Sequence, residues 1–428
     1  MHYNTMIVLA GAGVLGACSG LVGSFAVLRR RALTGDALAH AALPGLCVAF
    51  LLVGEKSLPA MLLGALASGL LGIAVISAIT MGTRIKQDAA IGLVLSVSFG
   101  AGVVLLRMIQ NLSTTGSKAG LESFVLGKTA GMIAQDVYLI AGVALLCLLL
   151  ILILYKEFQV VAFDPAFAQV QGWPAYWIDL LLMAMIAVTV VIGLPAVGVV
   201  LMSALLIIPA ATARFWTQNL GATLVLSALL GVAIGLAGTA VTANLPYPAG
   251  PSIVLAGGGF FLTSVLFAPR RGVVARILNE RSFRRQLAQQ RLLSACYELI
   301  EPELRQGRSL EECTLAREAL FECRTWSTLE FENSLRSLAA VGAIAAERRD
   351  GIALTRAGLV QAAELVRRLR LSELVLQQHS GASAAFAELD MSHGDEWIPA
   401  PLLSELEEQL KSAGRFPVGL SASEGEQR

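Results

Sequence analysis

Long stretches of the chain carry almost no charge, and they constrain the fold more than any other feature of the sequence. A helix needs about 20 apolar residues to cross the hydrocarbon of a bilayer, and nine stretches approach or exceed that length. They are residues 6–28, 37–53, 58–81, 89–106, 137–155, 177–193, 196–213, 220–241 and 252–267. The sequence therefore predicts an all-α polytopic membrane protein with nine transmembrane helices, or eight if residues 177–213 form one element broken around Gly193, Leu194 and Pro195.

The charged residues divide the chain into two parts. Residues 1–268 contain 11 Lys or Arg and 8 Asp or Glu, whereas the remaining 160 residues contain 21 and 23. Soluble proteins are about 25% charged, so only the second part has an ordinary soluble composition. We expect a transmembrane domain at 1–270, the start of a linker helix at 271–285, a cytoplasmic domain at 286–412 and a disordered tail at 413–428. Neither part has the large positive charge typical of nucleic-acid binding.

Basic residues in short loops predict the orientation, because such residues lie preferentially on the cytoplasmic side. Placing residues 29–31 in the cytoplasm also places there the other basic residues near span ends, which are Arg84, Lys86, Lys156, Arg214, Arg270 and Arg271. Lys118 and Lys128 are exceptions, since the loop of residues 107–135 then faces outside. Nine spans give an outside N terminus and a cytoplasmic C-terminal domain, whereas eight would reverse one end.

One pair of ionisable residues lies at the start of the second span. Asp36 and His40 are four residues apart, so both side chains leave one helix face and can converge on one ion. A carboxylate and an imidazole suit Zn²⁺, Mn²⁺ or Fe²⁺, and ionisable groups inside a span are functional candidates because their burial is costly. Alternatively, Asp36 caps the helix at the membrane interface and His40 satisfies a neighbouring helix. The spacing alone leaves both interpretations open.

Two short patterns imitate phosphate-binding motifs. Residues 11–16 match GxGxxG, but no strand precedes them and they lie inside a span, where small residues typically allow close helix packing. Gly127-Lys128-Thr129 imitates the end of a P-loop, but Glu122 occupies the position of its first glycine. We therefore expect no nucleotide site in this chain.

Several ordered stretches resemble the membrane subunits of ATP-binding-cassette (ABC) importers for manganese, zinc and iron. They are residues 36–45, 86–92, 120–127, 163–168 with Gly172, 198–201, 205–214 and 250–255, together with Pro246. The likeness covers residues 1 to about 270. It implies a type II ABC importer permease in a bacterial inner membrane, in which two permease subunits enclose one pore above two cytoplasmic ATPase subunits.

The resemblance also implies roles for particular residues. In this family an Asp and a His of the second span are the metal ligands of the pore, and the matching residues here are Asp36 and His40. The second permease subunit would be another copy or a paralogue, and an extracytoplasmic metal-binding protein would deliver Mn²⁺, Zn²⁺ or Fe²⁺. No covalently bound cofactor is implied. The chain would be a transporter subunit and not an enzyme, because ATP is hydrolysed on the ATPase subunits.

A short polar segment after the fifth span predicts where the ATPase docks. Asp164-Pro165 is typical of a helix start and Gly172 of a helix end, and the charge pattern places the segment in the cytoplasm. The resemblance makes it the coupling helix, with Asp164, Pro165, Ala168 and Gly172, which transmits ATPase closure to the pore. The alternative is an ordinary loop between spans.

The C-terminal part shows the pattern of three helices followed by a hairpin. Apolar residues recur at helical spacing between 287 and 300, and later helices are predicted at 315–323, 327–341, 356–378 and 401–412. Residues 342–354 predict two strands around an Asp-Gly turn. From about residue 285 to 412 this part resembles the winged-helix α+β domain of diphtheria-toxin-repressor-like metal regulators, with residues 354–358 as the exit from the wing.

The role of this domain is less well specified than its fold. Only His379 and His393 are available as imidazole ligands, and Trp397 stands where a second histidine would be needed, so we do not expect an intact regulatory metal site. A slightly acidic domain tethered to a membrane is also poorly suited to nucleic acid. We expect a module that packs on the ATPases or on its dimer mate. A membrane-anchored winged-helix metal-responsive regulator is the alternative function for the whole chain.

Overall fold

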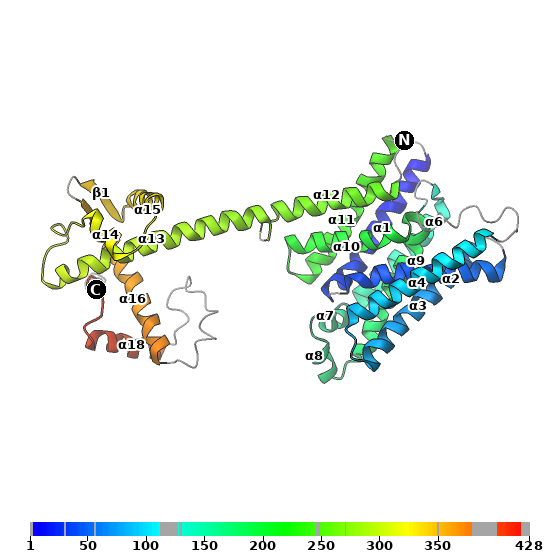
Figure 1. Cartoon of the computed structure of the whole chain (residues 1–428), viewed down its shortest axis with the longest axis horizontal. Helices are drawn as coiled ribbons and strands as arrows, with labels where there is room; N and C mark the ends of the chain where they lie inside the picture. The colour runs from blue at the N-terminus through cyan, green and yellow to red at the C-terminus, as the bar shows by residue number, and fades with distance from the viewer. Residues whose placement is uncertain are drawn as a thin grey trace. The chain divides into compact units, whose positions relative to one another are not determined.

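The computed structural model describes residues 3–29, 31–54, 57–111, 127, 131–244, 249–269, 271–348, 351–378 and 400–420. The chain divides into two compact units, Met1–Arg276 and Ile277–Arg428, which we call the membrane unit and the C-terminal unit. Figure 1 shows their elements coloured in chain order. The division falls within one continuous helix, α13 (Val273–Arg305), which includes residues 273–285 of the predicted linker.

Apolar helices make up most of the membrane unit. Among the described residues, eight helices are long and apolar enough to cross a membrane, and α10 is a shorter apolar helix. The nine are α1 (Tyr3–Leu28), α2 (Ala32–Val53), α3 (Leu58–Gly82), α4 (Gln87–Asn111), α6 (Ala134–Ile153), α9 (Ala175–Val197), α10 (Val199–Trp216), α11 (Leu220–Asn244) and α12 (Ala249–Phe267). The predicted multi-pass helical fold is confirmed.

α1 and α11 are antiparallel, and their backbones touch. Gly16 of α1 packs on Gly231 of α11, and Gly20, further along α1, packs on Ser227, further back along α11. A Cβ added to Gly16 would lie 2.1 Å from the carbonyl oxygen of Gly231. The hydroxyls of Ser24 and Ser227 join the same helices at 2.6 Å. The glycines at 11–16 therefore lie in a helix, and Gly16 serves the close packing that small residues permit in membranes.

The stretch predicted as residues 177–213 forms two helices, and the second crosses the bundle beside α12. α9 ends at Val197, which lies against Gly250 at the start of α12. α10 begins there, and the indole N–H of its last residue, Trp216, donates to Ser264 near the end of α12 at 2.9 Å. α10 thus runs parallel to a membrane helix for most of that helix's length. Among the described residues, α10 is nevertheless shorter than the eight helices that are long enough to cross a membrane.

The break between α9 and α10 lies later than the sequence predicted. Pro195 sits inside α9, because a proline removes only its own bond to the fourth preceding residue and the surrounding packing can hold the helix together. The chain changes direction at Gly198, whose φ of 91° suits glycine and few other residues. The predicted break at Gly193, Leu194 and Pro195 was therefore wrong by a few residues.

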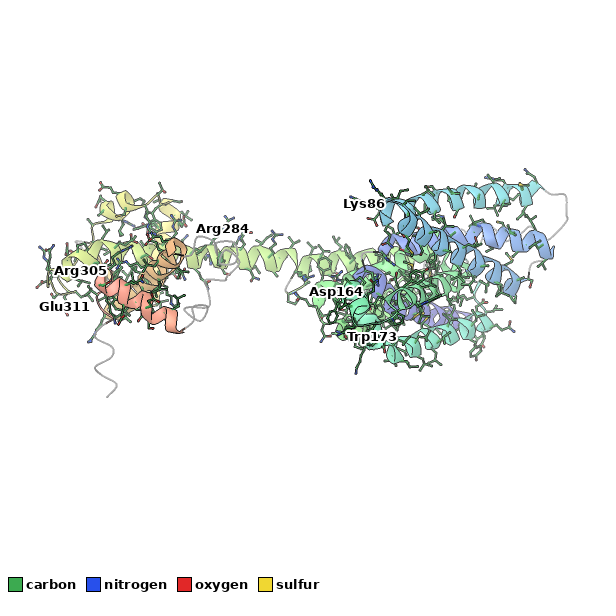
Figure 2. The ribbon with its side chains drawn as sticks, turned by 90° about the horizontal axis from the view of Figure 1, so that it is seen from below. Lys86, Asp164, Trp173, Arg284, Arg305 and Glu311 are labelled. Atoms are coloured by element: carbon green, nitrogen blue, oxygen red, sulfur yellow. The ribbon has the colours of Figure 1, made fainter. Side chains whose placement is uncertain are left out.

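Two short helices connect α6 to α9. They are α7 (Tyr155–Phe163) and α8 (Pro165–Val170). Figure 2 labels Asp164 and Trp173 on either side of α8. α7 is anchored by Phe158, which is fully buried and packs edge-on against Phe25 of α1 with ring centroids 5.6 Å apart. This contact fixes the α7–α8 segment to the end of α1.

The C-terminal unit contains the predicted helices and hairpin in the predicted order. After α13 come α14 (Arg317–Cys323), α15 (Thr328–Ala340), β1 (Ile344–Arg348), β2 (Gly351–Leu354), α16 (Arg356–Gln378) and α18 (Ala400–Ser412). The strands are antiparallel, with Ile344 opposite Leu354, and Leu315 forms a further bridge to Ile352. The fully buried Tyr297 and Phe331 belong to one core that joins the helices to the hairpin.

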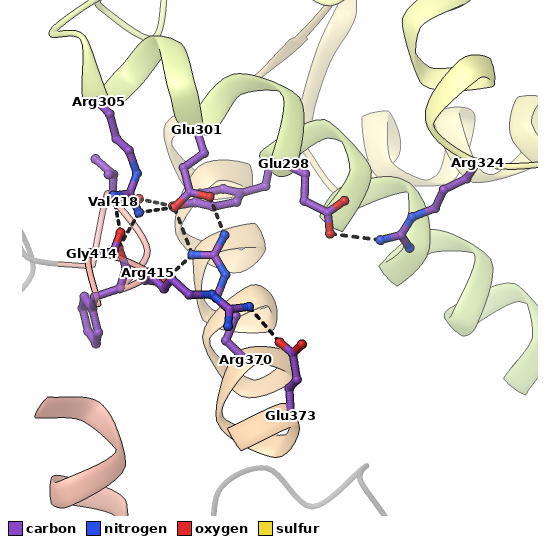
Figure 3. Close-up of polar contacts among 11 residues, drawn as sticks. Glu298, Glu301, Arg305, Arg324, Arg370, Glu373, Gly414, Arg415 and Val418 are labelled. Atoms are coloured by element: carbon purple, nitrogen blue, oxygen red, sulfur yellow. Dashed lines mark hydrogen bonds and ion pairs between the residues drawn. The ribbon is translucent and has the colours of Figure 1, made fainter. Parts of the chain in front are cut away.

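A carboxylate between two arginines ties α13 to α16 (Figure 3). Arg370 donates to both oxygens of Glu301, at 3.0 and 2.5 Å, and Arg305 donates to one of them at 2.7 Å. Burial raises the pKa of Glu301, but the two guanidinium groups outweigh burial and hold that pKa below its ordinary value. The Glu301 side chain, 9% exposed, is therefore a fully paired structural ion.

The end of the chain corrects another expectation. The sequence predicted disorder from residue 413, whereas residues 413–420 pack against the C-terminal unit. The hydroxyl of Tyr297 donates to the carbonyl of Val418 at 2.9 Å, and Leu420 packs on the core. Composition does not predict this order, because the contacts come from distant parts of the chain, such as Tyr297, which is 121 positions from Val418. Residues 421–428 lie outside the described residues.

Candidate functional site

α2 brings the predicted ligand pair together near its start. The Nε2 atom of His40 lies 3.6 Å from Oδ1 of Asp36, and the two side chains are 14% and 32% exposed. The imidazole also packs edge-on against Phe99 of α4, with ring centroids 5.0 Å apart. Helical spacing alone places the pair on one face, whereas Phe99 comes from a different helix and restricts how the imidazole can turn.

One ring nitrogen of His40 has no hydrogen-bond partner. Nδ1 of His40 is buried without a hydrogen-bond partner, and so is the hydroxyl of Thr34, one turn and a half earlier on α2. In the part of the chain that the structure describes, these are the two buried side-chain polar atoms left without a partner. An unsatisfied buried group costs about 1–3 kcal/mol. An ion held between Asp36 and His40 would meet Nε2, the nitrogen that faces Asp36, and not this buried Nδ1.

The donor atoms of the pair suit a borderline divalent cation. Imidazole nitrogen and carboxylate oxygen both bind Mn²⁺, Zn²⁺ and Fe²⁺. Two side chains do not complete a coordination shell, and the described ranges contain no group of three or more His, Cys, Asp or Glu able to hold a metal. Asp36 and His40 therefore supply two of the donors that an ion needs, and further donors must complete its coordination.

The segment predicted to couple with an ATPase forms α8, and its ends have the expected chemistry. Oδ1 of Asp164 accepts a hydrogen bond from the backbone N–H of Phe167 at 2.9 Å, which caps the helix. Pro165 occupies the first helical turn, where its missing N–H costs nothing. Gly172 follows the helix with a φ of 82°.

α8 presents an apolar surface. Ala168 is fully buried and anchors the helix, whereas Phe167 and Val170 are 50% and 87% exposed. Phe163, just before the helix, is also exposed. Apolar side chains held outward on a short capped helix form a protruding surface that a groove of another protein could receive.

Asp179, near the start of α9, joins three further segments. Its carboxylate oxygens lie 3.0 Å and 2.6 Å from Nη1 of Arg29 and Arg31. Arg29 also donates to the carbonyl of Val161 in α7 at 3.0 Å. The three charged side chains are at most 20% exposed. This arginine–aspartate cluster links the α7–α8 segment to the start of α2, five residues before Asp36.

Sequence reasoning missed this cluster, although a signal existed. In the sequence, Arg29 and Arg31 indicate only the orientation of the chain across the membrane, and Asp179 has no predicted partner. It is the one acidic residue of the predicted span 177–193, and an ionisable residue in a span usually has a partner. Phe99 and Thr34 gave no such signal, because aromatic rings and hydroxyls are ordinary in membrane helices.

Some of the motifs noted in the sequence lie outside the described residues. These are the residues Lys118, Glu122, Lys128, Pro246, Arg270, His379, His393 and Trp397. Gly127 is described, with a φ of 79°, and lies so close to the backbone of Val197 that a Cβ would be 2.3 Å from its carbonyl carbon. The glycine of the P-loop-like triplet therefore serves close backbone packing.

Comparison with known proteins gives consistent matches for the membrane unit. The chain is 45% identical over 301 residues to the manganese transport system membrane protein MntC of Bacillus subtilis (strain 168), covering 70% of this chain and 69% of that protein. It is 45% identical over 280 residues to the zinc transport system membrane protein TroC of Treponema pallidum (strain Nichols), covering 65% and 94%.

A solved structure and a family description agree with these matches. PsaBC from Streptococcus pneumoniae in complex with Fab has a TM-score of 0.57 and 32% sequence identity, covering 66% of this chain and 96% of that chain. Residues 1–268, which are more than half of the chain, match the family described as the ABC 3 transport family. The chain therefore belongs to the ABC 3 transport family.

Proposed function

We propose that this chain carries a divalent transition metal inward across the membrane, with Asp36 and His40 as transient ligands. Its family makes it a membrane-spanning permease of an ABC metal transporter, and not the enzyme that hydrolyses ATP. The observation that carries the site is the approach of Nε2 of His40, a largely buried imidazole, to Oδ1 of Asp36 at 3.6 Å on one face of a membrane helix. Such a group is expensive to keep in a span without a use.

Mn²⁺ and Zn²⁺ are the ions that we propose first. Two relatives of 45% identity are named as manganese and zinc transport proteins, and both ions accept one imidazole and one carboxylate. Fe²⁺ accepts the same donors and remains a third candidate. The donor set does not separate the three ions, so the uptake experiment below includes all of them.

A second permease subunit would complete the coordination. Asp36 and His40 supply two donors, and a second copy or a paralogue facing the same pore would supply two more. Four donors from two chains suit an ion that must be bound and then released, since transport needs sites weak enough to let the ion leave. The ABC family implies an ATPase and a substrate-binding protein as further partners.

We assign ATPase docking to α8. Its exposed Phe167 and Val170 would enter a groove on the ATPase, while the buried Ala168 keeps the helix fixed to the membrane unit. The arginine–aspartate cluster then offers a route for movement. A shift of α7–α8 would move Arg29, which is hydrogen-bonded to Val161. Asp179 would transmit this displacement to Arg31 at the start of α2, because it is paired with both arginines.

Metal uptake by cells tests the site. Asp36→Asn, His40→Gln and the double alanine variant would be expressed with the native ATPase and binding protein, and initial uptake of Mn²⁺, Zn²⁺ and Fe²⁺ measured. Losing a metal-facing group should lower uptake of the native ion about 100-fold or more, since even outer-shell changes cost about 10–100-fold in metal affinity. Immunoblots of the membrane fraction would confirm equal amounts of permease.

Asp88→Asn is the matched control. Asp88 is an exposed carboxylate in the first turn of α4, and its replacement should leave uptake unchanged. If the double alanine variant takes up all three ions at the wild-type rate, the assignment of Asp36 and His40 is wrong. If only one ion loses uptake in the variants, that ion is the substrate.

A further inference from the structure

Arginines are concentrated at the start of α13. Residues 271–291 contain six arginines and one acid, Glu280, for a net charge of +5, whereas residues 292–428 contain 14 basic and 22 acidic residues, for a net charge of −8. The basic segment begins four residues after α12 ends at Phe267. An anionic partner is therefore attracted to this segment and repelled by most of the chain that follows it.

Apolar and basic side chains share one face of this helix. At about 100° per residue, Ile277, Arg281, Arg284 and Arg285 fall within roughly a third of the circumference. Ile277 and its neighbour Leu278 are 45% and 58% exposed, and the three arginines are exposed as well. Clusters of about 4–8 basic residues directly after a transmembrane helix are typical of segments that bind anionic lipid headgroups.

A cavity of about 690 Å³ opens beside this face, between α13 and α15. Arg284, Arg285 and Arg291 line it from α13, and Glu330 contributes to the opposite wall. Arg284 pairs with Glu280 at 2.6 Å, but both side chains are more than half exposed, so the pair contributes little. Figure 2 shows Arg284 pointing away from the helix. The three arginines thus line a space large enough for a phosphate-bearing group. The Arg291 guanidinium also lies over the ring of Trp326, 5.4 Å from its centroid.

We propose that Arg281, Arg284, Arg285 and Arg291, which we call the arginine face of α13, bind the headgroups of anionic phospholipids. The headgroups of the bilayer are the nearest source of anions along the chain, because α13 begins six residues after a membrane helix ends. At about 1.5 Å per residue, Arg281 and Arg285 lie roughly 12 and 18 Å along the helix from Val273. Each arginine near an anionic leaflet strengthens binding about fivefold.

Nucleic acid is the competing anion, and the neighbouring helix disfavours it. In a winged helix the third helix usually enters the DNA groove, and here α15 exposes Leu329, Glu330 and Arg336. A surface with equal numbers of acidic and basic groups gives no attraction to phosphate backbones. The lipid surface is therefore the occupant that the charges favour, and DNA binding becomes an outcome of the test.

Fluorescence quenching on the full chain tests the proposal. A fluorophore would be attached at Leu278→Cys in a Cys323→Ser background, because Cys323 is exposed and the other five cysteines are buried. The protein would be placed in nanodiscs of phosphatidylcholine alone or with phosphatidylglycerol, each with nitroxide-labelled lipid. We expect stronger quenching with phosphatidylglycerol, and loss of that difference at high salt and in R281Q/R284Q/R285Q.

Two control variants separate recognition from misfolding and from net charge. R281K/R284K/R285K keeps the charge and should keep the response to phosphatidylglycerol. R308Q/R336Q/R356Q removes the same charge elsewhere on the C-terminal unit and should keep it too. Equal quenching in both lipids, or loss of the response in both glutamine variants, would overturn the proposal. Retention of duplex DNA by the wild type, lost in R281Q/R284Q/R285Q, would reassign the arginine face to nucleic acid.

Discussion

Asp36 in the membrane unit and Glu301 in the C-terminal unit are both shielded carboxylates on helices, but they are paired very differently. Glu301 receives three hydrogen bonds from two arginines, at 3.0 Å or less. Asp36 lies 3.6 Å from an imidazole whose other nitrogen has no partner among the described residues. A carboxylate saturated by guanidinium groups holds helices together, whereas one beside an imidazole keeps its oxygens available for a cation.

The difference does not come from the membrane itself. Asp179 also belongs to the membrane unit, and it is paired with Arg29 and Arg31 at 3.0 and 2.6 Å, much as Glu301 is paired with its two arginines. The membrane unit therefore contains both kinds of carboxylate, the saturated Asp179 and the open Asp36. Pairing, and not location, distinguishes a structural ion from a candidate ligand.

The largest effect is expected from Asp179→Asn. Losing the shared carboxylate leaves Arg29 and Arg31, 12% and 19% exposed, without their counter-ion. Breaking such a shielded pair costs about 3–5 kcal/mol. Hydrogen exchange of the amides at the end of α1 and the start of α2 should accelerate about 100-fold or more. Asp136→Asn is the control, because it keeps a capping oxygen at the start of α6, and its amides should exchange at the wild-type rate. Unchanged exchange in Asp179→Asn would contradict a structural role for the arginine–aspartate cluster.

Glu301→Gln should have a slightly smaller effect, confined to the C-terminal unit. Its two arginines are 16% and 38% exposed, so solvent compensates Arg305 better than it does Arg370. We expect the free energy of unfolding of the C-terminal unit to fall by about 3 kcal/mol, seen as faster hydrogen exchange in α13 and α16.

Glu373→Gln is the matched control, since Glu373 and its partner Arg415 are both nearly half exposed and such a pair contributes at most about 1 kcal/mol. Similar exchange in the two variants would remove the distinction between saturated and superficial pairs.

Acidification should weaken the same cluster without any mutation. The pKa of Glu301 lies below its ordinary value of 4.5 in the folded protein, so the unfolded chain takes up the proton first as the pH falls. The stabilisation is therefore complete above about pH 5 and is lost progressively below it. Hydrogen exchange of α16, corrected for the intrinsic pH dependence, should accelerate in this range in the wild type. Glu301→Gln should show less of this acceleration, and an equal acceleration in both proteins would place the acid sensitivity elsewhere.

The smallest effect on folding is expected from Asp36→Asn, the same change that should strongly lower uptake. Asp36 is 32% exposed and has no arginine partner in the described ranges, so its replacement leaves no shielded cation unpaired. The free energy of unfolding of the membrane unit should change by less than about 1 kcal/mol. Hydrogen exchange of α2 measures this directly. Acceleration as large as that in Asp179→Asn would show that Asp36 is a structural ion and would contradict the distinction between saturated and open carboxylates.

The features predicted well from the sequence are those that depend on neighbouring residues. The lengths of the apolar runs placed α3, α11 and the other membrane helices to within a few residues. The spacing of Asp36 and His40 was enough to bring their side chains together, because a helix repeats about every 3.6 residues. The cap at Asp164 likewise involves residues only three positions apart. Helix formation and capping are short-range, so a local pattern specifies them.

Contacts between distant segments required the tertiary structure. Arg31 and Asp179 are 148 positions apart, and Tyr297 and Val418 are 121 apart. The sequence showed the charges of Arg31 and Asp179 but not that they meet, and composition alone suggested a disordered tail where Val418 is held. Whether a carboxylate is saturated depends on which helices pack beside it. The sequence by itself therefore determined that Asp36 and His40 form a pair, and only the packing of α2 decided that no arginine of the described ranges saturates the Asp36 carboxylate.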